Sequence, residues 1–298
     1  MSPRPNRRGA LGLLCGAGFG AMAGPLRAIS ISPVAWGNFG LEIERAQLTQ
    51  GGWLRARLTK PGQVVGLQLG ATAIQPDDNG RFFVGFDRDA QPSAYLIGAC
   101  GSSEPCTFHG ERPEFGLSIA PRAWQIEQID APLRPPSVPS EQFLAIRKGE
   151  LAQIAAARAL QTGARGWLQQ MVRPAPGRIS GRFGAQRIYR GEPGSYHTGL
   201  DLAAAAGTPI LAPADGVVIL AAAVPFTLEG KLLMVDHGMG LSSAFLHCSA
   251  HRVGEGDAVR QGQPIADVGM TGRATGPHLH WGLRWREARL DPLLFLPA

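Results

Sequence analysis

The stretch GPHLHWGLRW, residues 276–285, decides the fold class of the C-terminal half of this chain. It places His278 and His280 two residues apart in an apolar, aromatic-rich run. In a β-strand, residues i and i+2 project from the same face of the sheet. We therefore expect both imidazoles to point into one cleft while Leu279 turns into the core. A pair of histidines on a solvated strand face is the alternative, and this stretch alone does not separate the two.

The sequence before this stretch indicates short strands joined by glycine and proline turns. Apolar runs of strand length occur in GTPILAPADGVVILAA (207–222), KLLMVDHG (231–238) and LSSAFLH (241–247). In VGEGDAVRQGQPIADVG (253–269), apolar residues recur between glycines every few positions, which is typical of tight hairpins in a compact sheet. These runs predict a C-terminal antiparallel β-sheet domain over residues 166–298.

The N-terminal half is also β-patterned. Alternating runs such as WLRARLTKPG (53–62) and RFFVGFDRD (81–89) are separated by turn signals, among them DDNG (77–80). Several short alternating strands with frequent turns are typical of a small antiparallel sandwich. We therefore predict a β-sandwich-like accessory domain over residues 30–135.

A linker and a connecting helix are predicted between these parts, over residues 136–165. The proline-rich run PLRPPSVPS sustains neither a helix nor a sheet. Apolar side chains then recur near helical spacing from about Glu141 to Gln161, with Ser140 as a suitable N-cap. The predicted fold class is mainly β. Because the linker divides the two β patterns, we expect residues from about 166 onward to form an independent core.

Composition excludes several classes of protein. The 298 residues include 40 Gly and 24 Pro, which argues against a helical bundle or a coiled coil. Apolar residues make up 44% of the chain, so general disorder is not expected. The formal net charge is +6, but Arg4, Arg7 and Arg8 lie in the first few residues and no Lys/Arg-rich run follows. We therefore expect no nucleic-acid partner.

The first 23 residues have the pattern of a signal peptide. A basic stretch ending at Arg8 precedes an apolar run over residues 9–22, and Ala21-Met22-Ala23 is a small-x-small cleavage signature. An uncleaved anchor or a buried helix is the alternative. No later segment offers about 18 consecutive apolar residues. We expect export to the periplasm or cell envelope, with no transmembrane segment once residues 1–23 are removed.

The cysteines agree with export. Cys100 and Cys106 flank the short loop GSSEP, which a disulfide could close in an oxidising compartment, and two buried free thiols are the alternative. Cys248 directly follows His247. Because sequence neighbours on a strand face opposite ways, we do not expect His247 to activate Cys248 as a nucleophile.

Six of the seven histidines gather in one part of the chain, at His197, His237, His247, His251, His278 and His280. Such a gathering suggests a metal site or an acid–base site. The stretch YHTGLDLA places His197 four residues before Asp201, and both are ordinary Zn²⁺ ligands, although this spacing alone is weak. His247 ends an apolar strand, where a structural hydrogen-bonding role is common. His237 and His251 lack a partner pattern and are expected to be structural.

Three protein ligands would leave a tetrahedral Zn²⁺ with one open position for water, which is the arrangement of a hydrolytic site. Proteases with a His-Glu-x-x-His motif use a glutamate as the base. No glutamate lies within the histidine motifs of this chain. In a hydrolase of this kind, histidines that are not ligands would handle the proton.

Taken in order, these motifs resemble the LytM/lysostaphin-type zinc endopeptidases, which cut peptidoglycan cross-links. The similarity covers about residues 177–285 and includes GTPILAPADGVV, KLLMVDHGMGLSSAFLH and VRQGQPIADVGMTGRATGPHLHWGL. One position departs from the family, which commonly has Tyr two residues before the middle His, where this chain has Phe245. This position is not a ligand, so we expect little consequence.

The resemblance implies a role for each site residue. His197, Asp201 and His280 would hold one Zn²⁺ per chain. His247 and His278 would be catalytic, polarising the water and stabilising the oxyanion. The implied fold is a small antiparallel β-sheet core with a groove between loops.

The resulting prediction is a secreted zinc metalloendopeptidase that hydrolyses peptide cross-links of bacterial peptidoglycan. The alternative is a non-catalytic relative that binds and activates a separate cell-wall amidase. Such relatives typically lose zinc ligands, whereas this chain keeps all of them. The N-terminal domain is expected to restrict or direct the site without supplying catalytic groups, since its one histidine, His109, lacks a ligand-type neighbour pattern. A chain starting near Gln161 is accordingly predicted to fold, bind zinc and hydrolyse the substrate.

Overall fold

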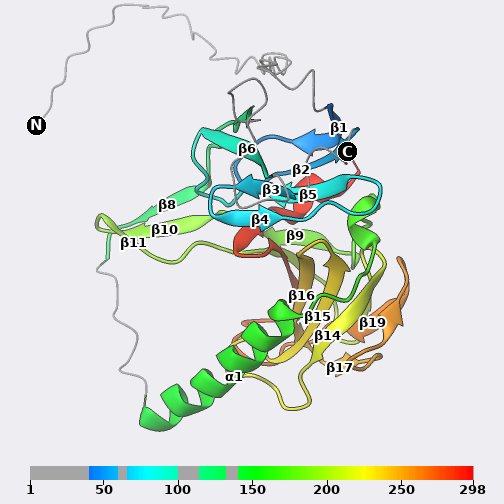
Figure 1. The fold of residues 1–298 in the computed structure, drawn as a ribbon. Helices are drawn as coiled ribbons and strands as arrows, with labels where there is room; N and C mark the ends of the chain where they lie inside the picture. The colour runs from blue at the N-terminus through cyan, green and yellow to red at the C-terminus, as the bar shows by residue number, and fades with distance from the viewer. Residues whose placement is uncertain (1–39, 60–65, 100–113, 132–139, 298) are drawn as a thin grey trace, which may run out of the picture. The chain divides into compact units, whose positions relative to one another are not determined.

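The computed structural model describes residues 40–59, 66–99, 114–131 and 140–297, and in these ranges the fold is mainly β (Figure 1). The described strands form five sheets, and one α-helix separates the N-terminal from the C-terminal strands along the sequence. The predicted fold class is confirmed. Several predicted features lie outside the described residues, namely the signal peptide at residues 1–23, Cys100, Cys106 and His109.

The N-terminal strands form two antiparallel sheets, as expected for a sandwich-like domain. The sheets have the orders β1-β2-β5 and β4-β3-β6-β7. The strand bounds are β1 Leu41–Gln47, β2 Trp53–Leu58, β3 Gly66–Leu69, β4 Thr72–Ile74, β5 Arg81–Gly85, β6 Ser93–Ala99 and β7 Glu114–Ser118. Side chains alternate along β7, so that Phe115 and Leu117 join a core that also contains Leu54 and Phe82.

The C-terminal strands form a large antiparallel sheet and one small sheet, and two of them form a second small sheet with β8. The large sheet has the order β18-β14-β15-β16-β20-β12-β9, with β21 also paired to β20, and the small sheets have the orders β13-β19-β17 and β11-β10-β8. The bounds are β8 Ile126–Ile129, β9 Arg178–Gly181, β10 Gln186–Tyr189, β11 Glu192–Pro193, β12 Leu200–Ala203, β13 Pro209–Leu211, β14 Gly216–Ala221, β15 Lys231–Gly238, β16 Leu241–Cys248, β17 Ala250–His251, β18 Ala258–Val259, β19 Pro264–Asp267, β20 His278–Trp285 and β21 Ala288–Leu290. The stretch that decided the fold class is therefore an inner strand of the large sheet, and Leu279 is fully buried in it.

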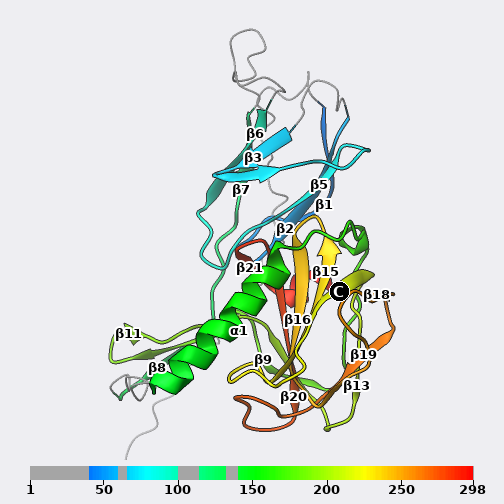
Figure 2. The ribbon, with the colours of Figure 1, turned by 60° about the horizontal axis from the view of Figure 1, so that its bottom comes forward.

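Helix α1 (Glu141–Ala159) begins where the sequence predicts and ends within about one turn of the predicted end. The Ser140 hydroxyl accepts a hydrogen bond from the Phe143 amide at 3.1 Å, which caps the helix. Ile154 and Ala157 pack into a hydrophobic cluster with side chains of β14 and β15, and Figure 2 shows the C-terminal end of α1 beside the large sheet. No helix in the described part of the chain is long and apolar enough to cross a membrane.

One hydrophobic core joins the N-terminal and C-terminal strands. Trp53 of β2 stacks on Phe83 of β5 and on Phe295 near the C-terminal end, at ring-centroid distances of 5.7 and 5.2 Å. The indole N–H of Trp53 also donates to the Leu294 carbonyl at 3.1 Å. The core thus crosses the predicted boundary at residue 166, in contrast to the independent core expected from the linker.

The segment after β7 adds a second connection between the two parts. Strand β8 pairs in parallel with β10, from Ile126 opposite Gln186 to Ile129 opposite Tyr189. The guanidinium group of Arg88 donates to the Gly184 carbonyl at 3.1 Å and lies over the Tyr196 ring at 4.5 Å. Because Tyr196 directly precedes His197, the N-terminal part contacts the segment that carries a predicted ligand.

Candidate metal centre and active site

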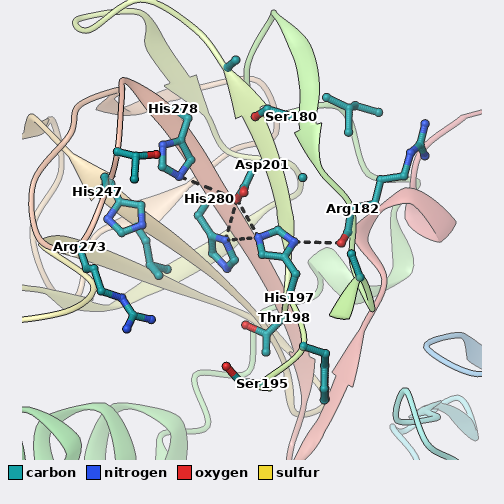
Figure 3. A pocket seen from close by; sticks show the side chains of 18 of the residues that line it. Ser180, Arg182, Ser195, His197, Thr198, Asp201, His247, Arg273, His278 and His280 are labelled. Atoms are coloured by element: carbon teal, nitrogen blue, oxygen red, sulfur yellow. Dashed lines mark hydrogen bonds and ion pairs between the residues drawn. The ribbon is translucent and has the colours of Figure 1, made fainter. Parts of the chain in front are cut away.

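Two neighbouring strands bring the predicted ligands together. In the antiparallel pair β12–β20, Asp201 lies directly opposite His280. The segment before β12 is held by reciprocal backbone bonds, in which the His197 amide donates to the Ala185 carbonyl and the Gly184 amide donates to the His197 carbonyl, both at 2.8 Å. The side chains of His197, Asp201 and His280 point toward one another (Figure 3).

The three potential ligand atoms form a small triangle. His197 Nε2 lies 3.0 Å from Asp201 Oδ1, and His280 Nδ1 lies 2.8 Å from the same oxygen. The two nitrogens are 3.1 Å apart. Ligand atoms bound to zinc at about 2.0–2.2 Å in a tetrahedron would be about 3.3 Å apart. The triangle is therefore close to the size of one face of such a tetrahedron.

Hydrogen bonding outside the triangle makes it a site for a cation. His197 Nδ1 lies 3.0 Å from the Arg182 carbonyl oxygen. A carbonyl can only accept, so Nδ1 carries the hydrogen and the Nε2 lone pair of the neutral ring is directed at Asp201 Oδ1. A lone pair and a carboxylate oxygen at this distance need a positive charge between them, either a proton or a metal ion. The donor set and its outer hydrogen bond fit a zinc ion.

The surroundings keep the Asp201 carboxylate ionised. Burial alone would raise the pKa of Asp201, but hydrogen bonds from His197 and His280 outweigh it and hold that pKa far below its usual range. Burial would lower the pKa of His197, but the same carboxylate outweighs it and raises that pKa. The pKa of His280 is lowered because burial exceeds the effect of Asp201. Without a metal ion, the raised pKa of His197 lets a proton lie between its Nε2 and Asp201 Oδ1, and metal binding would release that proton.

Two further histidines lie beside the triangle. His278 Nδ1 donates to the Gly276 carbonyl at 2.8 Å, and its Nε2 lies 3.9 Å from Asp201 Oδ1. His247 Nδ1 donates to the Thr271 carbonyl at 2.8 Å, and its ring centroid lies 5.0 Å from that of His278. Both rings therefore hold their Nδ1–H in backbone bonds and keep Nε2 for other partners. Burial lowers the pKa of His247, which favours its neutral form as a proton acceptor.

The backbone of His247 adopts an unusual conformation. Its φ of 64° lies in the left-handed region, which non-glycine residues rarely occupy. Two backbone bonds hold it there: the His247 amide donates to the Glu229 carbonyl at 2.8 Å, and the Thr271 amide donates to the His247 carbonyl at 3.4 Å. Such conformations persist only where surrounding contacts enforce them, and they concentrate at functional sites.

All five of these side chains line one open pocket of about 1330 Å³. The pocket is also lined by residues that the sequence analysis did not predict. Glu127 of β8 and Gln125, which directly precedes β8, line it on one side, and Glu229 and Arg273 line it from two loops of the C-terminal part. The position of Glu127 results from the long-range β8–β10 pairing, for which the sequence carries no local signal.

The remaining residues singled out by sequence lie in other surroundings. His237 is fully buried, its Nδ1 donates to the Asp215 carbonyl and its Nε2 accepts from the Ser243 hydroxyl, both at 2.8 Å. His251 lies in the short strand β17, away from the pocket lining. Burial raises the pKa of the Cys248 thiol to about 12, which opposes a role as a nucleophile.

The C-terminal part is similar to known peptidases. The model of peptidase family M23 matches residues 195–292. The DD-carboxypeptidase/endopeptidase Mpg of Neisseria meningitidis is 40% identical over 126 residues, which are 39% of this chain and 26% of that protein. The peptidoglycan DD-endopeptidase ShyA of Vibrio cholerae is 38% identical over 110 residues, which are 36% of this chain and 24% of that protein. The chain thus spans about a quarter of the length of these curated relatives.

The structural similarity extends further along the chain. A crystal structure from Pseudomonas aeruginosa, described as a peptidase M23, superposes with a TM-score of 0.63 at 28% sequence identity. The superposition covers 84% of this chain and 95% of that one, so it includes much of the N-terminal part in addition to the family segment.

Proposed function

Because the chain belongs to peptidase family M23 through residues 195–292, we propose that it is a zinc-dependent endopeptidase acting on peptide cross-links of bacterial peptidoglycan. The observation that carries this proposal is the triangle of ligand atoms of His197, Asp201 and His280, with edges of 2.8 to 3.1 Å. Two relatives with the names of peptidoglycan or DD-peptide hydrolases support the substrate class.

His197, Asp201 and His280 would hold one zinc ion. A bound zinc ion supplies Lewis-acid activation of a water molecule and of the scissile carbonyl. Asp201 contributes a permanent negative charge, since its pKa is far below its usual range. The Arg182 carbonyl fixes the orientation of the His197 ring through Nδ1.

His278 and His247 would handle the proton and the developing negative charge. Each ring is oriented by an Nδ1–H donated to a backbone carbonyl, so that Nε2 is the nitrogen left for the reaction. With Nε2 only 3.9 Å from a ligand oxygen, His278 is well placed to take a proton from a water bound beside Asp201. His247 lies next to His278 and its ring is neutral at rest, so it would stabilise the oxyanion once its Nε2 has taken up a proton.

The charges around the pocket suit an acidic peptide. Arg178, Arg182 and Arg273 line the pocket, and none of their guanidinium groups forms an ion pair with any residue in the described ranges. Cross-link peptides carry carboxylates, which these arginines can attract and pair with. Figure 3 shows Arg182 and Arg273 on opposite sides of the histidine cluster, so a bound chain could pass between them. Such a substrate requires export, in agreement with the leader pattern at residues 1–23.

A non-catalytic activator of a cell-wall amidase is not favoured. Such a protein has no need of a complete ligand set flanked by two oriented histidines, and this chain has both.

Digestion of purified cell wall tests the proposal. The full chain with one equivalent of zinc should release new amino and carboxyl termini within the cross-link peptides, identified by mass spectrometry. The products should be absent after chelation and return on addition of zinc. Release of sugar termini alone, or of no new peptide termini, would contradict the proposed activity.

A further inference from the structure

Helix α1 reaches the pocket through a network of charged side chains. Arg147 donates two hydrogen bonds to the Glu229 carboxylate, at 2.6 and 2.7 Å, in a paired geometry. Glu150 accepts from the Thr227 amide at 2.6 Å and from the Thr227 hydroxyl at 2.7 Å. A bond of 2.9 Å from Arg147 to Glu150 joins the two pairs. Glu150 is buried and Arg147 is mostly shielded, so water competes little for these bonds.

The turn that receives these bonds also holds His247. Phe226 and Gly230 close the turn through two backbone bonds, of 2.8 and 3.0 Å. Within it, the Glu229 carbonyl accepts the His247 amide at 2.8 Å. Glu229 therefore binds Arg147 of α1 through its carboxylate and His247 through its backbone carbonyl.

His247 needs such support because its backbone conformation is disfavoured. A non-glycine residue with a φ of 64° relaxes toward an ordinary strand conformation unless its neighbours prevent it. That relaxation would turn the imidazole away from His278 and from the ligand triangle. The Thr271 loop holds His247 from one side, and the 226–230 turn holds it from the other.

Shielded ion pairs often contribute little net stability, and in some proteins they specify one geometry instead. Helix α1 already has an apolar anchor, since Ile154 and Ala157 pack on the sheet. The charged network in addition holds the 226–230 turn in place, and Leu228 and Glu229 of this turn line the pocket.

We propose that Arg147 and Glu150 are positioning residues for hydrolysis, which set the 226–230 turn so that the Glu229 carbonyl holds His247 in its active conformation. This inference rests on the proposed function of His247. It gives α1 a part in the reaction beyond connecting the two β-rich regions.

The test compares R147Q, R147K and I154V in the full-length, zinc-loaded protein. R147Q removes the guanidinium charge and the paired bonds, whereas R147K keeps a charge but cannot form the paired geometry. I154V is the matched control, because it weakens α1 packing within the apolar cluster and leaves the charged network in place. The measurements are kcat and KM on a soluble cross-linked peptide, zinc content, Tm, and the imidazole ¹⁵N chemical shifts of His247.

R147Q should lower kcat by about tenfold or more, as expected for a small misplacement of a catalytic group, with KM changed by less than about twofold. Zinc content should stay at one per chain, the His247 shifts should move, and R147K should lie between R147Q and the unchanged protein. I154V should leave kcat and the His247 chemical shifts unchanged, even if its Tm falls as much as that of R147Q.

Equal kcat losses in R147Q and I154V at equal Tm would overturn the proposal, as would unmoved His247 shifts in R147Q. If the unchanged protein binds zinc but cuts no peptide, the proposed function fails. The His247 shifts of R147Q would still decide whether the network positions that ring.

Discussion

Three backbone carbonyls determine which nitrogen of the pocket histidines is free to react. The Nδ1 atoms of three rings face carbonyl oxygens at 2.8 to 3.0 Å, and the pairs are His197 with Arg182, His247 with Thr271 and His278 with Gly276. Because a carbonyl only accepts, each of these rings keeps Nε2 for a metal ion, a water or a substrate. His280 differs from these three rings, because its Nδ1 is the nitrogen that faces Asp201 Oδ1.

The assignment of His278 and His247 as acid–base groups predicts a separation of metal binding from turnover. H278A and H247A should each retain zinc while losing turnover by about 10²–10⁴-fold, the usual contribution of a general acid or base. Elemental analysis and single-turnover cleavage of a cross-linked peptide would check this. Loss of zinc in H278A would mean that His278 is a ligand and that the proposed roles must be exchanged.

His237 predicts a pH dependence of stability. Its two ring nitrogens are satisfied in a fully buried position, and burial lowers its pKa below the ordinary value of 6.5. As the pH falls below about 6.5, the unfolded chain takes up a proton that the folded chain resists, so the free energy of unfolding decreases. At higher pH both states are neutral at this residue and the effect vanishes.

The H237Q variant isolates this contribution. Urea unfolding of metal-free protein from about pH 5 to pH 7 should show a shallower pH dependence in H237Q than in the unchanged chain, by up to one proton. An identical slope in both proteins would show that His237 does not resist protonation in the fold.

At the scale of the elements, the close approach of β9 to β12 predicts the effect of a single methyl group. Gly181 lies opposite Asp201, and a Cβ added at Gly181 would come within 2.4 Å of Asp201 Oδ2 and 3.1 Å of His197 Cε1. G181A should therefore push the carboxylate out of the triangle and weaken zinc binding. The matched control is G254A, since the nearest atom to its added Cβ is 3.9 Å away and Gly254 lies outside the pocket lining. Competition with a chelating dye would measure the zinc affinities of G181A and G254A. Equal affinities would count against Asp201 binding zinc from its observed position.

Local patterns predicted the elements, and long-range pairings placed the pocket walls. The alternation around Leu279 predicted that His278 and His280 share a cleft, and both do line the pocket. Ser140 predicted the start of α1. The Arg147–Glu229 pair joins residues 82 positions apart, so no spacing rule could reveal it. The left-handed conformation of His247 was also hidden, because it is imposed by two loops distant in sequence.

At the scale of the whole molecule, the shared core changes the expectation for a shortened chain. A protein starting near Gln161 would lose Trp53 and Phe83 from their stack with Phe295, and would lose Arg88 from its place over Tyr196. Uncovered apolar surface of this kind destabilises a domain and promotes association. The sequence alone suggested an independent fold, because a proline-rich linker indicates a break along the chain and carries no information on how the two parts pack together.

The shortened chain should therefore melt at least several degrees below the full chain, or associate. Thermal unfolding of both proteins at equal zinc saturation, with light scattering to detect association, would check this. A monomeric shortened chain with an unchanged Tm would show that the core from residue 166 onward is independent after all.

The zinc content of H280A tests the central claim most directly, since this claim is that His197, Asp201 and His280 hold a single zinc ion. Elemental analysis after exhaustive dialysis should give one zinc per chain for the unchanged protein and for H278A, and close to none for H280A, because losing one of three protein ligands typically weakens a zinc site by orders of magnitude. An undiminished zinc content in H280A would contradict the assignment of the metal centre.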